Sequence, residues 1–180
     1  MSDLHLRFPI GRYKSVDSPS DLQISEWIET LERFPQDLLR LVESLSTQDL
    51  EWMYRPGSWS IKQVVHHCAD SHMNSLIRFK LTLTEELPTI RPYLEAEWAK
   101  LIDSNESDLR YSLQIISAVH GKWVLILKNL SAEQFQRKYI HPESGREFSL
   151  AQACGLYAWH AEHHLKHIEN ALKFKGVFPA

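Results

Sequence analysis

Four histidines stand close together near the carboxyl end of the sequence, at positions 160, 163, 164 and 167. In a helix, side chains four residues apart project from adjacent turns of one face, so the imidazoles of His160 and His164 can bind the same ion. His163 and His167 extend this surface, and spacing alone therefore leaves the choice of ligand pair open. With ten histidines in 180 residues, such pairs also arise by chance.

A second histidine pair, His66 and His67, lies in a segment with a polar stripe. Polar residues recur there at intervals of mostly three or four: Gln63, His67, Asp70, Ser71, Asn74 and Arg78. Such a stripe is either a solvated helix face or the lining of a pocket. Because neighbouring residues on a helix point about 100° apart, only one of the two histidines can face an ion. The stripe favours His67, and His66 stays an alternative.

The sequence lacks the motifs of several common enzyme classes. It contains no HExxH, GxSxG, Walker loop or GxGxxG, so zinc-protease, serine-hydrolase and nucleotide-binding signatures are absent. Cys68 and Cys154 each lie in an apolar helical pattern, which is typical of small core residues rather than thiol nucleophiles. His120 also occupies an apolar position, where it is either a hydrogen-bonded core residue or a proton carrier that faces the pocket.

The composition is that of a globular protein without a strongly charged binding surface. Hydrophobic residues make up 43% and charged residues 24%, with a net charge of -3. The absence of a Lys/Arg-rich run argues against nucleic acid or an anionic membrane as partner. The length fits one domain, 1–180. Two scattered cysteines, no signal peptide and no apolar run of about 18 residues together indicate a cytoplasmic protein.

Four amphipathic segments must position these side chains. Apolar residues spaced three and four apart predict helices over about 20–45, 61–87, 107–130 and 150–175. Ser-x-x-Gln pairs beginning at Ser20, Ser60 and Ser149 predict capping boxes, and Pro35 should kink or split the first helix. In the second helix, the predicted apolar series is Val64, Val65, Cys68, Met73, Leu76, Ile77, Phe79 and Leu83.

The connections between these segments contain few regular elements. About twenty residues with prolines at 88 and 92 join the second and third helices, and 93–101 could form a short helix. A turn at 141–145, with a short strand on either side, should precede the last helix, which Gly176 ends as the C′ residue. These features predict an all-α protein, a four-helix bundle with long connections whose facing helices can build a metal site.

Several segments closely resemble the YfiT-like metal-dependent hydrolases of the DinB superfamily. The match covers nearly the whole chain, and its most specific part is 64–74 joined to 157–160 and 163–165. Further matching segments are 8–13, 54–57 with Trp59, 78–80 and 141–145.

The resemblance implies a bundle that holds one divalent metal ion per chain, zinc or nickel, with one histidine on the second helix and two on the last. The family's first histidine lies eight residues after its tryptophan, which gives His67 when counted from Trp59. The other two fall on His160 and His164. The resemblance also implies a cytoplasmic homodimer, and some relatives conjugate low-molecular-weight thiols such as bacillithiol to electrophiles.

Three neutral imidazoles leave at least one coordination position open, as in catalytic zinc sites. An ion there lowers the pKa of bound water toward about 7, which supports hydrolysis of a small-molecule substrate. The same ion could hold a thiol as thiolate, which would give a thiol S-transferase. A third hypothesis is a non-catalytic metal-binding dimerisation module. Asp70 and His163 are candidates for the general base or for partners that orient the ligands. Glu162 or a backbone carbonyl is a further candidate to accept a hydrogen bond from a ligating histidine.

Overall fold

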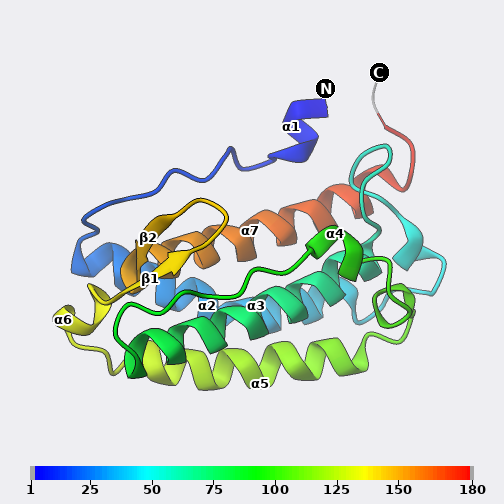
Figure 1. Ribbon diagram of the computed structural model, residues 1–180. Coiled ribbons are helices and arrows are strands. Elements are labelled where there is room, and N and C mark those ends of the chain that lie inside the picture. Colours follow the sequence, from blue (N-terminus) through cyan, green and yellow to red (C-terminus); the bar gives the residue numbers. More distant parts are fainter. Residues whose placement is uncertain (1–2, 179–180) are drawn as a thin grey trace.

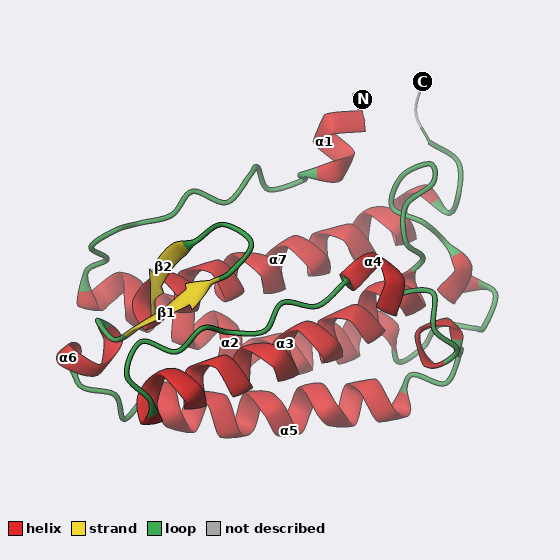
Figure 2. Cartoon of the chain, in the orientation of Figure 1, coloured by secondary structure: helices red, strands yellow, loops and turns green. Residues whose placement is uncertain are grey.

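The computed structural model describes residues 3–178, and four long helices dominate it (Figure 1). These are α2 (Asp21–Val42), α3 (Ile61–Thr84), α5 (Arg110–Leu127) and α7 (Leu150–Phe174). The shorter elements are α1 (Asp3–Arg7), η1 (Asp49–Glu51), α4 (Glu95–Trp98), η2 (Asp103–Asn105), α6 (Ala132–Phe135), β1 (Lys138–His141) and β2 (Arg146–Ser149). Figure 2 shows one small hairpin in an otherwise helical fold. The predicted four-helix bundle is confirmed.

The long helices form a bundle in which parallel and antiparallel neighbours alternate. α2 packs on α5 and α7, and α3 packs on the same two helices. The colours in Figure 1 show that α2 and α7 run in one direction while α3 and α5 run in the other. Because α3 and α5 are parallel neighbours, the connection over 85–109 must return along the length of the bundle. This geometry explains the long connection predicted from the sequence.

Local sequence signals set the helix ends. The capping boxes predicted at Ser20, Ser60 and Ser149 are all present, and a fourth, which the sequence analysis did not predict, begins α6 at Ser131. These boxes satisfy free N–H groups of the first helical turn. Gly176, with φ of 80°, follows α7 as the predicted C′ residue.

The two predicted strands before the last helix are present as β1 and β2. They pair antiparallel, with Tyr139 opposite Phe148. The long connection attaches to the outer edge of β1, because Ile90 N donates to Ile140 O at 3.0 Å and Ile140 N donates to Pro88 O at 2.9 Å. The hairpin therefore holds the beginning of the long connection against the start of α7. The predicted short helix is α4, which lies within 93–101.

The apolar core forms two clusters, one toward each end of the bundle. On α3 the first cluster ends at Ala69 and the second begins at Leu76. Between them lies His72, which is fully buried. The predicted apolar face of this helix is therefore partly wrong: Ile77 is 51% exposed, whereas His72 and Ser75 are buried. Hydrophobic periodicity misses inward-facing polar side chains, and His72 tolerates burial because both of its ring nitrogens have hydrogen-bond partners.

None of the helices in residues 3–178 combines the length and hydrophobicity that crossing a bilayer requires.

Candidate metal centre

His67, His160 and His164, all predicted as ligands, converge at the contact between α3 and α7. One nitrogen from each ring lies within 4.8 Å of the other two. Nε2 of His67 and Nε2 of His160 are 3.2 Å apart. Two imidazole nitrogens on one tetrahedral zinc ion, at bond lengths of about 2.1 Å, would lie about 3.4 Å apart. The spacing of the cluster therefore fits three ligands to one ion.

Two helices hold these rings in place. His160 and His164 lie one turn apart on α7, with ring centroids 4.4 Å apart. His67 reaches across from α3, with its centroid 4.9 Å from that of His164. The indole of Trp59, just before α3, packs against His67 at a centroid distance of 4.7 Å. The cluster thus depends on the packing of α3 against α7 and not on a mobile loop.

Burial keeps the three rings in the protonation state that a metal ligand needs. It lowers the pKa of His67 to about 4, with a smaller contribution from nearby His163. It also lowers the pKa values of His160 and His164 well below 6.5. At neutral pH all three imidazoles are therefore neutral, with a lone pair available. Nδ1 of His164 is buried and has no hydrogen-bond partner among residues 3–178.

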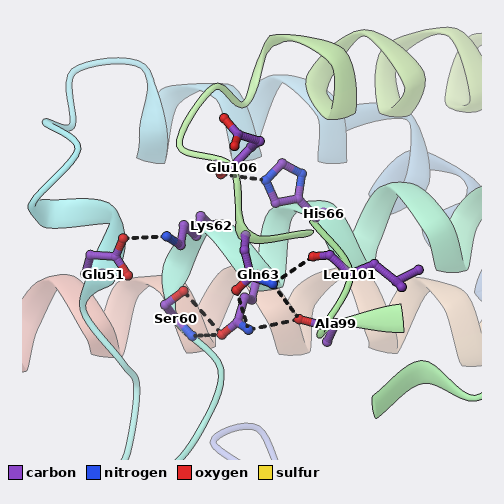
Figure 3. A network of polar contacts seen from close by, with 9 residues as sticks. Glu51, Ser60, Lys62, Gln63, His66, Ala99, Leu101 and Glu106 are labelled. Atoms are coloured by element: carbon purple, nitrogen blue, oxygen red, sulfur yellow. Dashed lines mark hydrogen bonds and ion pairs between the residues drawn. The ribbon is translucent and has the colours of Figure 1, made fainter. Parts of the chain in front are cut away.

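His66, the alternative to His67, makes a structural contact with a different helix. Its Nδ1 lies 2.7 Å from Ser112 Oγ, and its Nε2 lies 3.0 Å from the carbonyl oxygen of Glu106. Figure 3 shows the ring pointing toward Glu106. In the same network, Gln63 donates to the carbonyl oxygen of Ala99 at 3.1 Å. These bonds fasten the start of α3 to the end of the long connection, and His66 has no part in the metal cluster.

The cluster opens into a cleft of about 470 Å³ between α7 and the amino-terminal segment, which contributes Arg7 and Phe8 to the cleft wall. His167, the remaining candidate on α7, belongs to its wall. The ring of His167 stacks on Tyr54 at 3.7 Å, and its Nε2 donates to the carbonyl oxygen of Arg7 at 3.2 Å. The amino-terminal segment is also held by Trp159, whose Nε1 donates to Gly11 O at 3.3 Å.

His163, a predicted general base or orienting partner, lines the same cleft. Its ring stacks on Trp159 with centroids 4.4 Å apart and planes 18° from parallel. Burial lowers its pKa to about 4, so the ring is neutral at neutral pH. Its Nδ1 is buried and has no hydrogen-bond partner within the described chain. Of the two predicted bases, this side chain is the one that lies beside the three clustered histidines, with its ring centroid 5.2 Å from that of His164.

Asp70, the other predicted base, lines a separate cleft of about 230 Å³ with Asp103, Glu106 and Asp108. Burial, with a contribution from Asp103, raises its pKa to about 6. Asp70 is not among the described residues that line the cleft beside His67, His160 and His164. Its role at the metal stays a prediction. Glu162, proposed as a hydrogen-bond acceptor for a ligand, is exposed.

A further cleft, of about 510 Å³, shares Glu95, Ala96 and His160 with the cleft of about 470 Å³. Ser71 and Arg78 of α3 line this further cleft together with Tyr93 and Tyr157. The polar stripe predicted on this helix is therefore a pocket lining over much of its length, and not a solvated face.

His72, which the sequence patterns did not single out, is hydrogen-bonded to His160 of the histidine cluster. Nε2 of His72 lies 2.9 Å from Nδ1 of His160, on the ring edge away from His67. On its other side, Nδ1 of His72 lies 2.6 Å from Nε2 of His120. The spacing of His72, four residues after Cys68 and four before Leu76, is that of a buried position but does not reveal its partners.

The bundle and the histidine cluster define the class of the protein. Residues 30–168 match the DinB superfamily, and the chain belongs to this family. It is 46% identical over 176 residues to "Putative metal-dependent hydrolase YfiT" from Bacillus subtilis, covering 98% of this chain and 99% of that protein. A relative from Bacillus mycoides, also named a "putative metal-dependent hydrolase", is 45% identical over 165 residues, covering 92% and 94% of the two chains.

Two solved structures are similar to this one. Bacillus subtilis YfiT, described as "a probable metal-dependent hydrolase with an unusual four-helix bundle topology", superimposes with a TM-score of 0.92 at 45% identity, covering 96% of this chain and 98% of that chain. A mycothiol-dependent maleylpyruvate isomerase superimposes with a TM-score of 0.64 at 12% identity, covering 84% of this chain and 61% of that chain. The second similarity concerns the fold alone.

Proposed function

We propose that this protein is a metal-dependent hydrolase of small molecules, in which His67, His160 and His164 hold one divalent ion. The observation that carries the proposal is the convergence of three neutral imidazole nitrogens within 4.8 Å of one another at the wall of a cleft. Imidazole nitrogens are common ligands of zinc and also suit nickel, and we propose zinc as the ion, with nickel as the alternative. The names of the relatives support the metal dependence and the hydrolase class.

The ion and His163 have separate roles in this reaction. The ion, when bound, supplies the Lewis acidity that makes water a nucleophile near neutral pH. His163 takes the proton, because it lines the cleft as a neutral ring next to His164, with ring centroids 5.2 Å apart. Its stack on Trp159 fixes the plane of the ring. The clefts of about 470 and 510 Å³ that meet at His160 are of a size for a small-molecule substrate.

Hydrolysis is tested by loading the protein with zinc or nickel and assaying a panel of esters and amides. We expect cleavage that requires the metal and is lost in His164→Ala. The matched control is His66→Leu, which should keep the activity because His66 contacts Ser112 and Glu106 instead of the cluster. A parallel assay follows the loss of a low-molecular-weight thiol in the presence of monochlorobimane. Metal-dependent thiol consumption without ester or amide cleavage would contradict the hydrolase proposal.

We also propose the homodimer that the family resemblance implies. Light scattering on the purified protein should give twice the mass of the 21.0 kDa chain, and a monomer mass at micromolar concentration would rule the dimer out.

A further inference from the structure

A line of hydrogen-bonded groups crosses the bundle and ends at a metal ligand. The carbonyl oxygen of Leu31 on α2 lies 2.6 Å from Nδ1 of His120 on α5. Nε2 of His120 lies 2.6 Å from Nδ1 of His72 on α3, whose Nε2 lies 2.9 Å from Nδ1 of His160 on α7. Each of the four long helices contributes one member. The line occupies the boundary between the two apolar clusters of the core.

The direction of this line is fixed at its inner end, because a carbonyl oxygen can only accept. Nδ1 of His120 must therefore carry the proton, which leaves Nε2 of the neutral ring as an acceptor. The same logic makes Nδ1 of His72 the donor to His120 and Nε2 of His72 the acceptor from His160. His160 then carries its proton on Nδ1. Its Nε2 keeps the lone pair, and this is the nitrogen that faces His67.

The carbonyl of Leu31 is available because of the proline inside α2. In a regular helix this oxygen would accept the N–H of residue 35. Pro35 has no N–H, so the bond is missing from a helix that nevertheless continues from Asp21 to Val42. His120 supplies the replacement donor. Pro35, a helix breaker by sequence, thus leaves the carbonyl oxygen of Leu31 free to accept the hydrogen bond at the inner end of the line.

The surroundings make these hydrogen bonds strong and hard to replace. His72 is 0% and His120 is 1% exposed. The ring of Phe34 packs on both, with centroids 5.0 Å from His72 and 5.2 Å from His120, and Trp123 and Tyr157 meet His72 edge-on. In such apolar surroundings a broken bond leaves an unpaired polar group that water cannot reach, which is costly.

We propose that Pro35 and Leu31, acting through His120 and His72, fix the tautomer of His160 that turns its Nε2 lone pair toward the metal. His72 and His120 are positioning residues in this scheme. The inference rests on the proposed function for the metal itself, but the tautomers exist with or without an ion. Groups that orient a metal-bound histidine typically contribute 10–100-fold to metal affinity.

The first test uses the metal-free protein. Long-range ¹H–¹⁵N NMR spectra distinguish the two neutral tautomers of each histidine. We expect His72, His120 and His160 all to carry the proton on Nδ1. A proton on Nε2 of His160, or a mixture of the two forms there, overturns the proposal. If the wild-type protein binds no metal, the proposed function fails, while this spectrum still decides the tautomers.

The second test compares variants of His72 by competition titration with a zinc chelator. His72→Leu removes the acceptor for His160 and should weaken zinc binding about 10–100-fold. His72→Gln offers a side-chain oxygen near the former Nε2 and should keep most of the affinity. The matched control is His66→Leu, which also removes a buried, hydrogen-bonded histidine from the same helix and should bind zinc as the wild type does. Equal losses in the two leucine variants would mean that His72 acts only through stability.

A third variant, Pro35→Ala, tests the inner end of the line without touching a histidine. The new N–H competes with His120 for the carbonyl of Leu31, so the His120 Nδ1–H resonance should move upfield. An unchanged resonance would show that Pro35 does not keep this acceptor available.

Discussion

Gly155 of α7 lies against the indole of Trp27 of α2 so closely that a Cβ added at this glycine would be 2.8 Å from Cη2 of the ring. Real Cβ atoms do not approach other atoms to this distance, so at the observed spacing of the parallel helices α2 and α7 a side chain at residue 155 would force Trp27 to move. The same helix carries His160 and His164. A change at the contact between Gly155 and Trp27 therefore acts on the helix that carries two of the three clustered histidines.

Replacing this glycine should destabilise the fold. Gly155→Ala forces the partly buried Trp27 away from α7, and overpacking of this kind costs about 1–3 kcal/mol in the free energy of unfolding. The matched control is Gly121→Ala on the exposed side of α5, where an added Cβ meets nothing within 4 Å. There, the better helix propensity of alanine should raise the free energy of unfolding by about 0.5–1 kcal/mol. Urea titrations check both, and shifts of the same sign would contradict the packing argument.

Acid should destabilise the metal-free protein, in part through His120. Burial lowers the pKa of His120 from 6.5 to about 4. Between these values the unfolded chain binds a proton that the folded chain does not, so stability is full above pH 6.5 and falls as the pH decreases toward 4. A shift of this size corresponds to about 3 kcal/mol.

The matching variant is His120→Gln, which has no titrating group at this position. Its free energy of unfolding, measured in urea from pH 7 to pH 4, should fall less steeply than that of the wild type. Parallel curves for the two proteins would show that His120 does not bind a proton on unfolding.

His163 should matter for the reaction but not for metal binding. His163→Phe keeps an aromatic ring to stack on Trp159 and removes both nitrogens, so the zinc content should stay at the wild-type level. The rate of hydrolysis should fall about 10²–10⁴-fold, the usual contribution of a general base. Glu162→Gln, at the exposed neighbouring position, serves as control. If Asp70→Asn lowers the rate as much and His163→Phe does not, the base is Asp70.

Neither cysteine should react while the protein is folded. Cys68 and Cys154 are both 0% exposed, and burial raises the pKa of the Cys154 thiol to about 12 and that of the Cys68 thiol further. A thiol that is neither accessible nor ionised is a poor nucleophile. Ellman's reagent should therefore report no thiol in the native protein and two after unfolding in guanidinium chloride. Rapid labelling of the native protein would contradict the burial of these residues.

Much of the fold could be predicted because local patterns determine it. Ser-x-x-Gln pairs mark where helices begin, and the spacing of apolar residues marks the four long segments. The parallel arrangement of α3 and α5 could not be predicted, because the periodicity of a helix says which face is buried but not which neighbour covers it. Pro35 was expected to disturb α2, but its consequence for Leu31 depends on His120, which is 89 residues away in the sequence.

The three clustered histidines of the site could be predicted, but the buried His72 behind them could not. The spacing of His160 and His164 suggested a shared ion, and the choice of His67 over His66 required the family resemblance. His72 escaped detection because a histidine in an apolar helical series interrupts the pattern and gives no sign of its partners. Its importance depends on two rings from other helices, His120 and His160, and tertiary packing alone brings these together.

The central claim is that His67, His160 and His164 hold one metal ion, and the metal content of the purified protein tests it most directly. After purification without chelators and dialysis against zinc and then metal-free buffer, elemental analysis should find one zinc ion per chain in the wild type and in His66→Leu. It should find far less in His67→Ala. A wild-type protein without bound metal, or a His67→Ala variant that retains as much as the wild type, would contradict this account.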